Sequence, residues 1–355
     1  MNFKIGDVPV GAGHPTLVVA EMAWAHDGSV DKGVVMIDAA ADAGAQVINL
    51  HSTSLSDYMV LAYGAGPARL SGDRNPSSVF NYLDQINLGP DALRQLTAHA
   101  RSRGLMVSTM CNDFASIKLA ATDLRPEMIM VHPSCILEEA FVRAAAEVGV
   151  PLMLYVGGLK LGEIETAIEW AVAAGNDRIV LQHGFQSYPT ALEDNNLRFI
   201  ATLKQVFGLP VSFGDHTDGD DAMALVVPQL AVALGADVIE KHITPNRAAK
   251  GEDFEAALNP DEWKTFVAQI RATEKTLGDG RYHPLTERQK TYRGAVRKRA
   301  VAVRDLSAGA VLAAEDICYK RSDGGLYPEE AKYLIGRKIR ADLPIEAPLT
   351  WDAVE

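Results

Sequence analysis

Short apolar and β-branched runs alternate with helical patterns through the first 280 residues. Between the runs, apolar residues recur at i, i+3 and i+4, as in residues 31–45 and 221–236, and several of these segments end at a glycine suited to a helix C-cap. The predicted strands are residues 16–21, 46–51, 105–110, 128–133, 151–158, 178–184, 210–217 and 237–243. Eight β-then-α units in this length predict an α/β fold, a (β/α)8 TIM barrel. An open doubly wound sheet is the alternative, but eight parallel strands favour closure.

Residues 52–90 form a connection that is much longer than a usual βα loop. Because they follow the second predicted strand, they would lie over the C-terminal mouth of the barrel. Tyr58, Met59, Leu61 and Tyr63 can pack there. We therefore predict a lid or substrate loop rather than a disordered insertion.

The pattern changes after residue 280. Residues 281–297 are polar and basic, which predicts a linker between a barrel domain at 1–280 and a second domain at 298–355. That second domain alternates short strands with turns at Ala308-Gly309 and Asp323-Gly324-Gly325, which predicts a small β-rich module.

Charge separates the same two parts of the chain. The net charge is −12, and residues 281–355 carry +3, which leaves −15 for residues 1–280. This asymmetry suggests a complementary contact between the two domains, within one chain or between chains. The acidic balance argues against a nucleic-acid partner.

The chain has no signal of a membrane or secreted protein. Its start lacks a basic region followed by an apolar one, and no apolar run is long enough to span a bilayer, so we expect a cytoplasmic protein. Cys111, Cys135 and Cys318 are odd in number and far apart, which fits a reducing compartment. We expect them to line the core or a pocket.

Polar residues gather at the C-terminal ends of the predicted strands, where TIM barrels carry their catalytic groups. They are Glu21, Asn49, His51, Thr109, His132, Tyr155, His183, Gln186, Asp215, His216, Glu240 and His242. In a barrel these ends converge on one mouth. Because side chains alternate along a strand, Glu240 and His242 would share the inward face with Val238, while Lys241 would point outward as a structural charge.

His216 and His242 would lie on the adjacent seventh and eighth strands. Imidazoles on adjacent strands are close enough to bind one divalent ion, with Glu21 or water completing the coordination shell. A hydrogen-bonded pocket histidine is the alternative for each of them. The same alternatives, metal ligand, substrate contact or packed polar residue, apply to His51, His132 and His183.

Five pieces of the chain, in order, resemble the sialic acid (N-acetylneuraminate) synthase family. They are VVAEMAWAHDGSVDKGVVMIDAAADAGA, QSYPTALEDNNL, SFGDHTDG, GADVIEKHIT with GEDFEAALNP, and a C-terminal module from KRAVAVRDLSAG onward that resembles the antifreeze-like SAF domain. The resemblance implies a barrel enzyme that condenses phosphoenolpyruvate with an open-chain amino sugar, using Mn²⁺ or Mg²⁺. Its products would be phosphate and a nine-carbon 2-keto-3-deoxy acid. It also implies a domain-swapped homodimer in which each SAF domain covers the partner's site.

The resemblance also assigns roles by position. His216 and His242 match metal ligands, Glu21 and Glu240 match carboxylates at the reacting centre, and Arg321 matches an arginine that the SAF domain lends to a neighbouring site. We name Glu21, Glu240 and His51 as catalytic candidates. The substrate-binding candidates are Asn49, Thr109, Ser134, Gln186, Tyr188, Asp253 and Arg321. Asp253 can alternatively be a turn residue, and Arg321 a solvated surface residue.

Several positions depart from the family pattern. Two lysines of the family fall at Asn49 and Val131, a glutamate falls at Ile136, and serines that hold phosphate fall at Tyr155 and Gly214. Losing two lysines removes positive charge from where a phosphate dianion would bind.

Three interpretations follow from these departures. Either His51, His132, Arg69 or Arg74 compensates for the lost lysines, or the donor has become an unphosphorylated keto acid in a diverged carbon–carbon lyase or synthase. The third is a barrel that binds sugar without turnover.

Overall fold

The structure is a computed structural model that describes residues 2–63, 79–185 and 187–355. The chain forms two compact units, Met1–Asp279 and Gly280–Glu355. Among the described residues, no helix has the length and apolar character needed to cross a bilayer.

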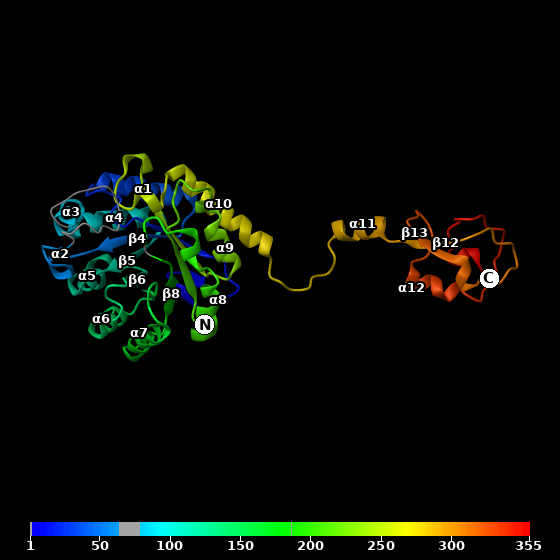
Figure 1. Cartoon of the computed structure of the whole chain (residues 1–355), viewed down its shortest axis with the longest axis horizontal. Coiled ribbons are helices and arrows are strands. Elements are labelled where there is room, and N and C mark those ends of the chain that lie inside the picture. The colour runs from blue at the N-terminus through cyan, green and yellow to red at the C-terminus, as the bar shows by residue number, and fades with distance from the viewer. Residues whose placement is uncertain (1, 64–78, 186) are drawn as a thin grey trace. The chain divides into compact units, whose positions relative to one another are not determined.

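The first unit is built on a ring of parallel strands (Figure 1). Strand β10 pairs with β9 on one side and β3 on the other, which closes the ring. The strands are β3 Leu17–Glu21, β4 Val47–Ser52, β5 Met106–Cys111, β6 Met128–Val131, β7 Leu152–Tyr155, β8 Ile179–His183, β9 Val211–Asp215 and β10 Val238–Ile243, with the two-residue β11 Ala257–Leu258 added beside β10. The eight predicted strands and the predicted TIM barrel are confirmed.

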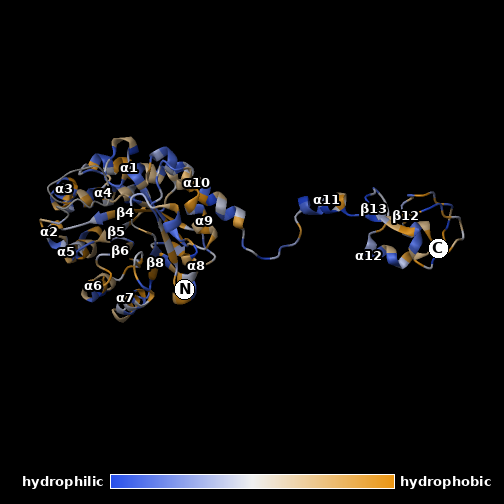
Figure 2. Ribbon diagram, viewed as in Figure 1, coloured by the Kyte–Doolittle hydropathy of each residue, from blue (hydrophilic) through white to orange (hydrophobic). Residues whose placement is uncertain are grey.

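Helices follow the strands and surround them (Figure 1). They are α1 Val30–Ala43, α4 Pro90–Ser102, α5 Phe114–Leu119, α6 Glu139–Glu147, α7 Leu161–Ala173, α8 Phe199–Phe207, α9 Val227–Ala233 and α10 Pro260–Leu277. In α1 the Ser29 side chain accepts a hydrogen bond from the Lys32 amide, and Gly44 ends the helix in the left-handed conformation. Apolar and polar stretches are mixed along the helix ribbons (Figure 2), and the apolar ones bury a core against the outer face of the strands.

One predicted helix is interrupted. Residues 221–236 divide into a 3₁₀ turn, Ala222–Leu225, and the helix α9. Pro228 lies in the first turn of α9, where its missing N–H costs nothing, whereas in the middle of a longer helix it would remove a hydrogen bond. The proline therefore sets where the helix begins.

A short hairpin closes one end of the barrel. Strands β1 Phe3–Ile5 and β2 Val8–Val10 are antiparallel, and Ile5 and Val10 pack among residues at the starts of the barrel strands, such as Leu17 and Val47. The sequence analysis did not predict this hairpin, because its strands are only three residues long. The hairpin fills this end of the barrel, which leaves the opposite, C-terminal end open.

Lys241 points out of the barrel interior, as predicted, but not into solvent. Its side chain is fully buried, and its Nζ lies 2.8 Å from the Asp215 Oδ2 and 2.8 Å from the Thr217 carbonyl oxygen, to which it donates. Asp215 in turn accepts hydrogen bonds from the Thr217 amide and hydroxyl. The pair links the ends of β9 and β10 behind the site.

The second unit has its own small core. Strands β12 Arg299–Ala302 and β13 Ile317–Lys320 pair antiparallel, α12 Pro328–Ala331 follows, and buried residues such as Leu312 and Leu349 pack inside, as predicted for a β-rich module. The predicted linker contains the helix α11 Glu287–Val296, which begins with a capping box at Thr286 and buries none of its residues.

Replacing Lys241 by Met should lower the free energy of unfolding by about 3 to 5 kcal/mol, because Asp215 would remain buried without its cation. Arg143→Met is the control, since the Arg143–Glu139 pair is solvent-exposed and should contribute less than about 1 kcal/mol. Urea denaturation followed by circular dichroism measures both. Equal effects of the two substitutions would contradict the structural role of the buried pair.

Candidate active site

A cavity of about 330 Å³ lies at the mouth of the barrel. One side is formed by apolar and aromatic residues that include Trp24 and, from the long connection, α2 Leu55–Tyr58 and α3 Val79–Ile86. Tyr58, Met59 and Tyr63 line it, whereas Leu61 is exposed. The strand-end residues that line it are Glu21, His51, His132, Tyr155, His216, Glu240 and His242.

The Glu21 carboxylate is held by an amide from the neighbouring strand. Asn49 Nδ2 donates to Glu21 Oε2 at 2.5 Å, and Ser108 Oγ donates to Asn49 Oδ1 at 2.7 Å. His51 Nε2 lies 3.5 Å from Glu21 Oε1. Asn49 is fully buried and does not line the cavity, so its contact in the structure is with the catalytic candidate Glu21 rather than with the space where a substrate would lie.

Glu240, on the strand β10 that pairs with β3, is held in the same way. Gln182 Nε2 donates to Glu240 Oε1 at 2.5 Å, and Ser212 Oγ donates to Gln182 Oε1 at 3.2 Å. Burial raises the pKa of Glu240 to about 7, against the lowering effect of the Gln182 hydrogen bond. Burial, and after it the charge of Glu240, raises the pKa of Glu21 well above its usual value. Each carboxyl group thus has one oxygen oriented by an amide that a serine orients in turn.

His216 and His242 come together at the ends of β9 and β10. Their ring centroids are 5.2 Å apart, and the Tyr188 ring packs edge-on against both, at 4.9 and 5.6 Å. Burial lowers the pKa of His216 to about 4 and that of His242 well below its usual value, so both imidazoles are neutral at pH 7. Among the described residues, neither Nδ1 atom has a hydrogen-bond partner. Asp253 Oδ2 lies 3.9 Å from His242 Nδ1.

These histidines fit a divalent cation as a two-ligand site. A neutral imidazole with an unused ring nitrogen is the form that binds metals. Within the described ranges, no group of three or more His, Cys, Asp or Glu side chains is arranged to hold an ion. His216 and His242 could therefore supply two nitrogens, and water or substrate oxygens would have to fill the remaining positions.

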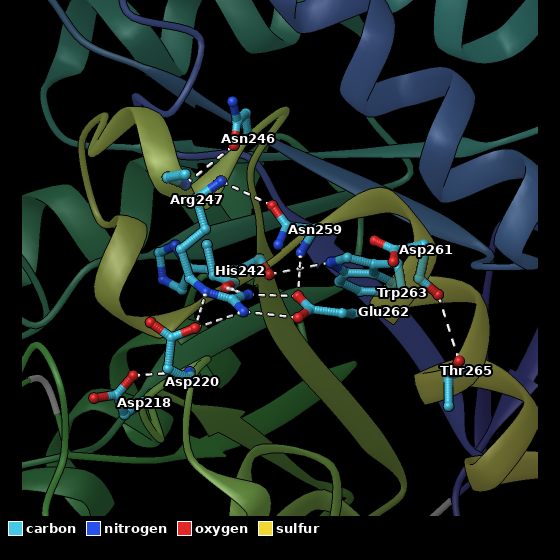
Figure 3. A network of polar contacts seen from close by, with 12 residues as sticks. Asp218, Asp220, His242, Asn246, Arg247, Asn259, Asp261, Glu262, Trp263 and Thr265 are labelled. Atoms are coloured by element: carbon cyan, nitrogen blue, oxygen red, sulfur yellow. Dashed lines mark hydrogen bonds and ion pairs between the residues drawn. The ribbon is translucent and has the colours of Figure 1, made fainter.

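A polar network fixes the backbone around His242 (Figure 3). Trp263 Nε1 donates to the His242 carbonyl oxygen at 3.1 Å. Arg247 forms ion pairs with Glu262 and Asp220, and its backbone amide donates to the Asn259 side chain. The network anchors both ends of the loop that carries Asp253, whose positive φ of 56° also makes it a turn residue.

Of the other predicted site residues, some line the cavity and some do not. Ser134 lines the cavity, and its Oγ lies 2.8 Å from His132 Nδ1. Thr109 is buried but does not line the cavity, because the residues on either side of it along β5 face the barrel interior. Arg321 belongs to the second unit, where it is exposed and donates to the Ala295 carbonyl oxygen. Gln186 lies outside the described residues.

Not every polar strand-end residue reaches the mouth. His183 Nε2 donates to the Asn195 carbonyl oxygen at 2.8 Å, and its ring packs against Phe199 and Phe213 outside the barrel interior. Asp215 binds Lys241. The expectation that all these residues converge on one mouth is therefore wrong for Thr109, His183 and Asp215, because each occupies an outward-facing position of its strand.

Comparison with known proteins decides the family. The model of the NeuB family matches residues 36–282, and that of the SAF domain matches residues 297–355. The chain belongs to the NeuB family.

Relatives of this NeuB-family chain match it over most or all of its length. A functionally uncharacterised protein of Methanocaldococcus jannaschii is 30% identical over 99% of this chain and 98% of its own length. The N,N'-diacetyllegionaminic acid synthase of Legionella pneumophila is 28% identical over 100% of this chain and 99% of its own. A crystal structure of N-acetylneuraminic acid synthetase from Leptospira borgpetersenii has a TM-score of 0.72 and 26% identity, covering 83% of this chain and 97% of that one. The resemblance to sialic acid synthases is confirmed.

The described cavity lining of this NeuB-family chain contains no lysine or arginine. It does contain four carboxyl groups, those of Glu21, Glu240, Glu252 and Asp253. Burial lowers the pKa of His51 to about 3 and that of His132 to about 4, so both are neutral at pH 7. Neither histidine can then replace a lost lysine, and Arg69 and Arg74 lie outside the described residues.

Three polar residues of the site were missed from sequence. All three lie within largely apolar strands: Gln182 holds Glu240, and Ser108 and Ser212 orient the amides of Asn49 and Gln182. Their signal was a polar residue at an inward-facing position of a strand, one to three residues from another candidate.

Replacing His216 or His242 by Ala should weaken Mn²⁺ binding by at least about 100-fold, because each removes one of two protein nitrogens. Isothermal titration calorimetry and the Mn²⁺ electron paramagnetic resonance signal measure the affinity without requiring turnover. His183→Ala, a strand-end histidine outside the cavity, should keep the wild-type affinity. Equal Mn²⁺ binding by all three variants would contradict the two-histidine site.

Proposed function

We propose that the protein is a divalent-metal-dependent enzyme that forms a carbon–carbon bond between a three-carbon enol donor and the aldehyde of an amino sugar or related polyhydroxy aldehyde. The observation that carries the proposal is the pair of neutral histidines, His216 and His242, beside the amide-held carboxyl groups of Glu21 and Glu240 in the mouth of a NeuB-family barrel. The acceptor class is supported by the names of the relatives, which are synthases of legionaminic and N-acetylneuraminic acid.

The chain's own residues would hold and orient the reactants. His216 and His242 would bind the cation, which when bound supplies a Lewis acid for the aldehyde oxygen. Tyr188 fixes both rings by edge contacts. Glu240 presents Oε2, which has no hydrogen-bond partner among the described residues, and can position a water molecule or a substrate hydroxyl.

Phosphoenolpyruvate is the first candidate for the donor, because it is the donor that family resemblance implies. Carbon 3 of the enol would bond to the aldehyde carbon, and the aldehyde oxygen would take up a proton. Water would add at carbon 2, and phosphate would leave as the carbon–oxygen bond breaks. The product is a 2-keto-3-deoxy acid.

An unphosphorylated 2-keto acid is the second candidate, favoured by the absence of lysine and arginine from the described lining. A carboxylate such as Glu240 would remove a proton from carbon 3 of pyruvate, and the resulting enolate would attack the aldehyde carbon. The alkoxide would then recover a proton, which gives a 4-hydroxy-2-keto acid without a leaving group. This reaction needs no site for a phosphate dianion.

A donor assay tests the proposal. Purified protein with Mn²⁺ and a panel of N-acetylated amino sugars should form a 2-keto acid detectable by mass spectrometry. Phosphate release with phosphoenolpyruvate identifies the first donor, and product from pyruvate without phosphate identifies the second. His216→Ala and His242→Ala should lower turnover by more than about 100-fold. If no product forms with either donor across the panel, the proposal is refuted. The remaining interpretation would then be a barrel that binds sugar without turnover.

Arg321 supports a proposed swapped homodimer, in which the SAF unit of one chain completes the site of the other. This part rests on resemblance to the family. The exposed guanidinium, and a net charge of +3 over residues 281–355 against −15 over residues 1–280, suit a contact between unlike units.

Mixing inactive variants tests the swap. His216→Ala and Arg321→Ala chains, each nearly inactive alone, should regain about a quarter of wild-type activity after unfolding and refolding together, because half of the dimers are then mixed and each mixed dimer has one intact site. Activity that stays at the level of the separate variants would contradict the swap. Arg304→Ala, a change elsewhere in the same unit, should remain active alone.

A further inference from the structure

The phenol of Tyr155 lies where three strand ends meet, and the mechanism above does not use it. Tyr155 is the last residue of β7 and pairs in register with Gln182 of β8. Its side chain is almost fully buried and lines the cavity. Its ring centroid is 6.5 Å from that of His216, so a group bound near the proposed cation would lie beside it.

Three glycines surround this phenol: Gly157, Gly184 and Gly214. None of them has a positive φ, so the backbone conformation does not require glycine at these positions. A Cβ atom on Gly184 would lie 2.9 Å from the Tyr155 hydroxyl oxygen, one on Gly214 would lie 3.4 Å from it, and one on Gly157 would lie 3.1 Å from the ring. A side chain at any of these three positions would come close to the phenol of Tyr155.

Other groups crowd these positions as well. At Gly157 and Gly184 a backbone carbonyl oxygen approaches closely, at 2.0 and 2.4 Å from the added Cβ. At Gly214 the nearest atom is the Gln182 amide nitrogen, at 2.7 Å, and the Tyr155 hydroxyl oxygen lies 3.4 Å away. The phenol thus shares with Gln182 the space that a side chain at Gly214 would enter.

The surroundings of the phenol are also unsuited to a dianion. Gly214 is opposite Glu240 in the β9–β10 register, and the Gln182 amide that lies near Gly214 already donates to Glu240. A phosphate group placed here would lie beside a carboxyl group, with no lysine or arginine among the described residues of the lining. Phosphate sites normally provide several charge-assisted hydrogen bonds.

We infer that Tyr155 is a specificity-determining residue that closes this part of the cavity to a phosphate group and offers its hydroxyl to a carboxylate or carbonyl oxygen of an unphosphorylated 2-keto acid. The inference rests on the proposed condensation and selects the second of its two donors. One neutral hydroxyl suits the single charge of a keto acid, whereas the phosphate of phosphoenolpyruvate would need the volume that the phenol fills, and would bind more tightly still with added positive charge.

Binding without turnover tests this inference. With Mn²⁺ present and no aldehyde, isothermal titration calorimetry should show tighter binding of pyruvate than of phosphoenolpyruvate by the wild-type protein. Tyr155→Phe keeps the bulk and loses one hydrogen bond, so pyruvate affinity should fall about two- to tenfold while phosphoenolpyruvate affinity stays within about twofold. Tyr155→Leu shortens the side chain, and phosphoenolpyruvate affinity should rise at least about fivefold.

The control is Tyr58→Leu, which removes a phenol from the α2 side of the same cavity and should leave the ratio of the two affinities unchanged. Wild-type preference for phosphoenolpyruvate, binding of neither probe, or no gain in a folded Tyr155→Leu variant would overturn the inference. If Tyr155→Leu does not fold, unchanged pyruvate affinity in Tyr155→Phe overturns it. The binding experiment contains no aldehyde, so it is independent of turnover. If the protein binds pyruvate more tightly than phosphoenolpyruvate but forms no product in the donor assay, the proposed reaction is wrong and the role of Tyr155 stands.

Discussion

Parallel pairing of β10 with both of its neighbours is the constraint on which the site depends. The register with β3 places His242 opposite Glu21, and the register with β9 places Glu240 opposite Gly214. A shift of one residue in either pairing would turn Glu240 and His242 toward the helices and bring Lys241 into the cavity. The buried Lys241–Asp215 ion pair on the outer face fits only one register, so the two faces of β10 specify the same alignment.

Burying several carboxyl groups in one cavity is unfavourable, and the structure offsets this by hydrogen bonding. Glu21 and Glu240 each receive an amide hydrogen bond from an adjacent or next-nearest strand, and each amide is oriented by a serine. Burial also raises the pKa of both groups, to about 7 for Glu240, so proton uptake lowers the cost of burying them. A divalent cation at the proposed histidine pair would favour their ionised forms, and the ionised forms would disfavour a second anion, which connects the proposed metal with the proposed donor.

The strands, the barrel and the nearness of His216 to His242 could be predicted because they follow from periodicity and from the adjacency of successive strands. Alternation also accounts for the residues that were wrongly expected at the mouth: His183 and Asp215 each end a strand and follow an inward-facing residue, Gln182 or Gly214, so their side chains face outward. The amides that hold Glu21 and Glu240 come from 28 and 58 residues away. Such contacts depend on the tilt and stagger of the closed ring, which a hydrophobic pattern does not contain. The β1–β2 hairpin was missed because three-residue strands carry too little pattern.

The two sides of the cavity are fixed by different contacts. His216 and His242 pack together against Tyr188, so a change at either alters the surroundings of the other. Tyr155 packs where Gly184 lacks a side chain, because a Cβ there would lie 2.9 Å from its hydroxyl oxygen, and at Gly214 a Cβ would meet the Gln182 amide first, at 2.7 Å. A large residue at one strand end and small residues at the next two therefore form one packing unit. Its appearance at the positions where the family resemblance places phosphate contacts alters the donor side of the cavity while leaving the histidine pair intact.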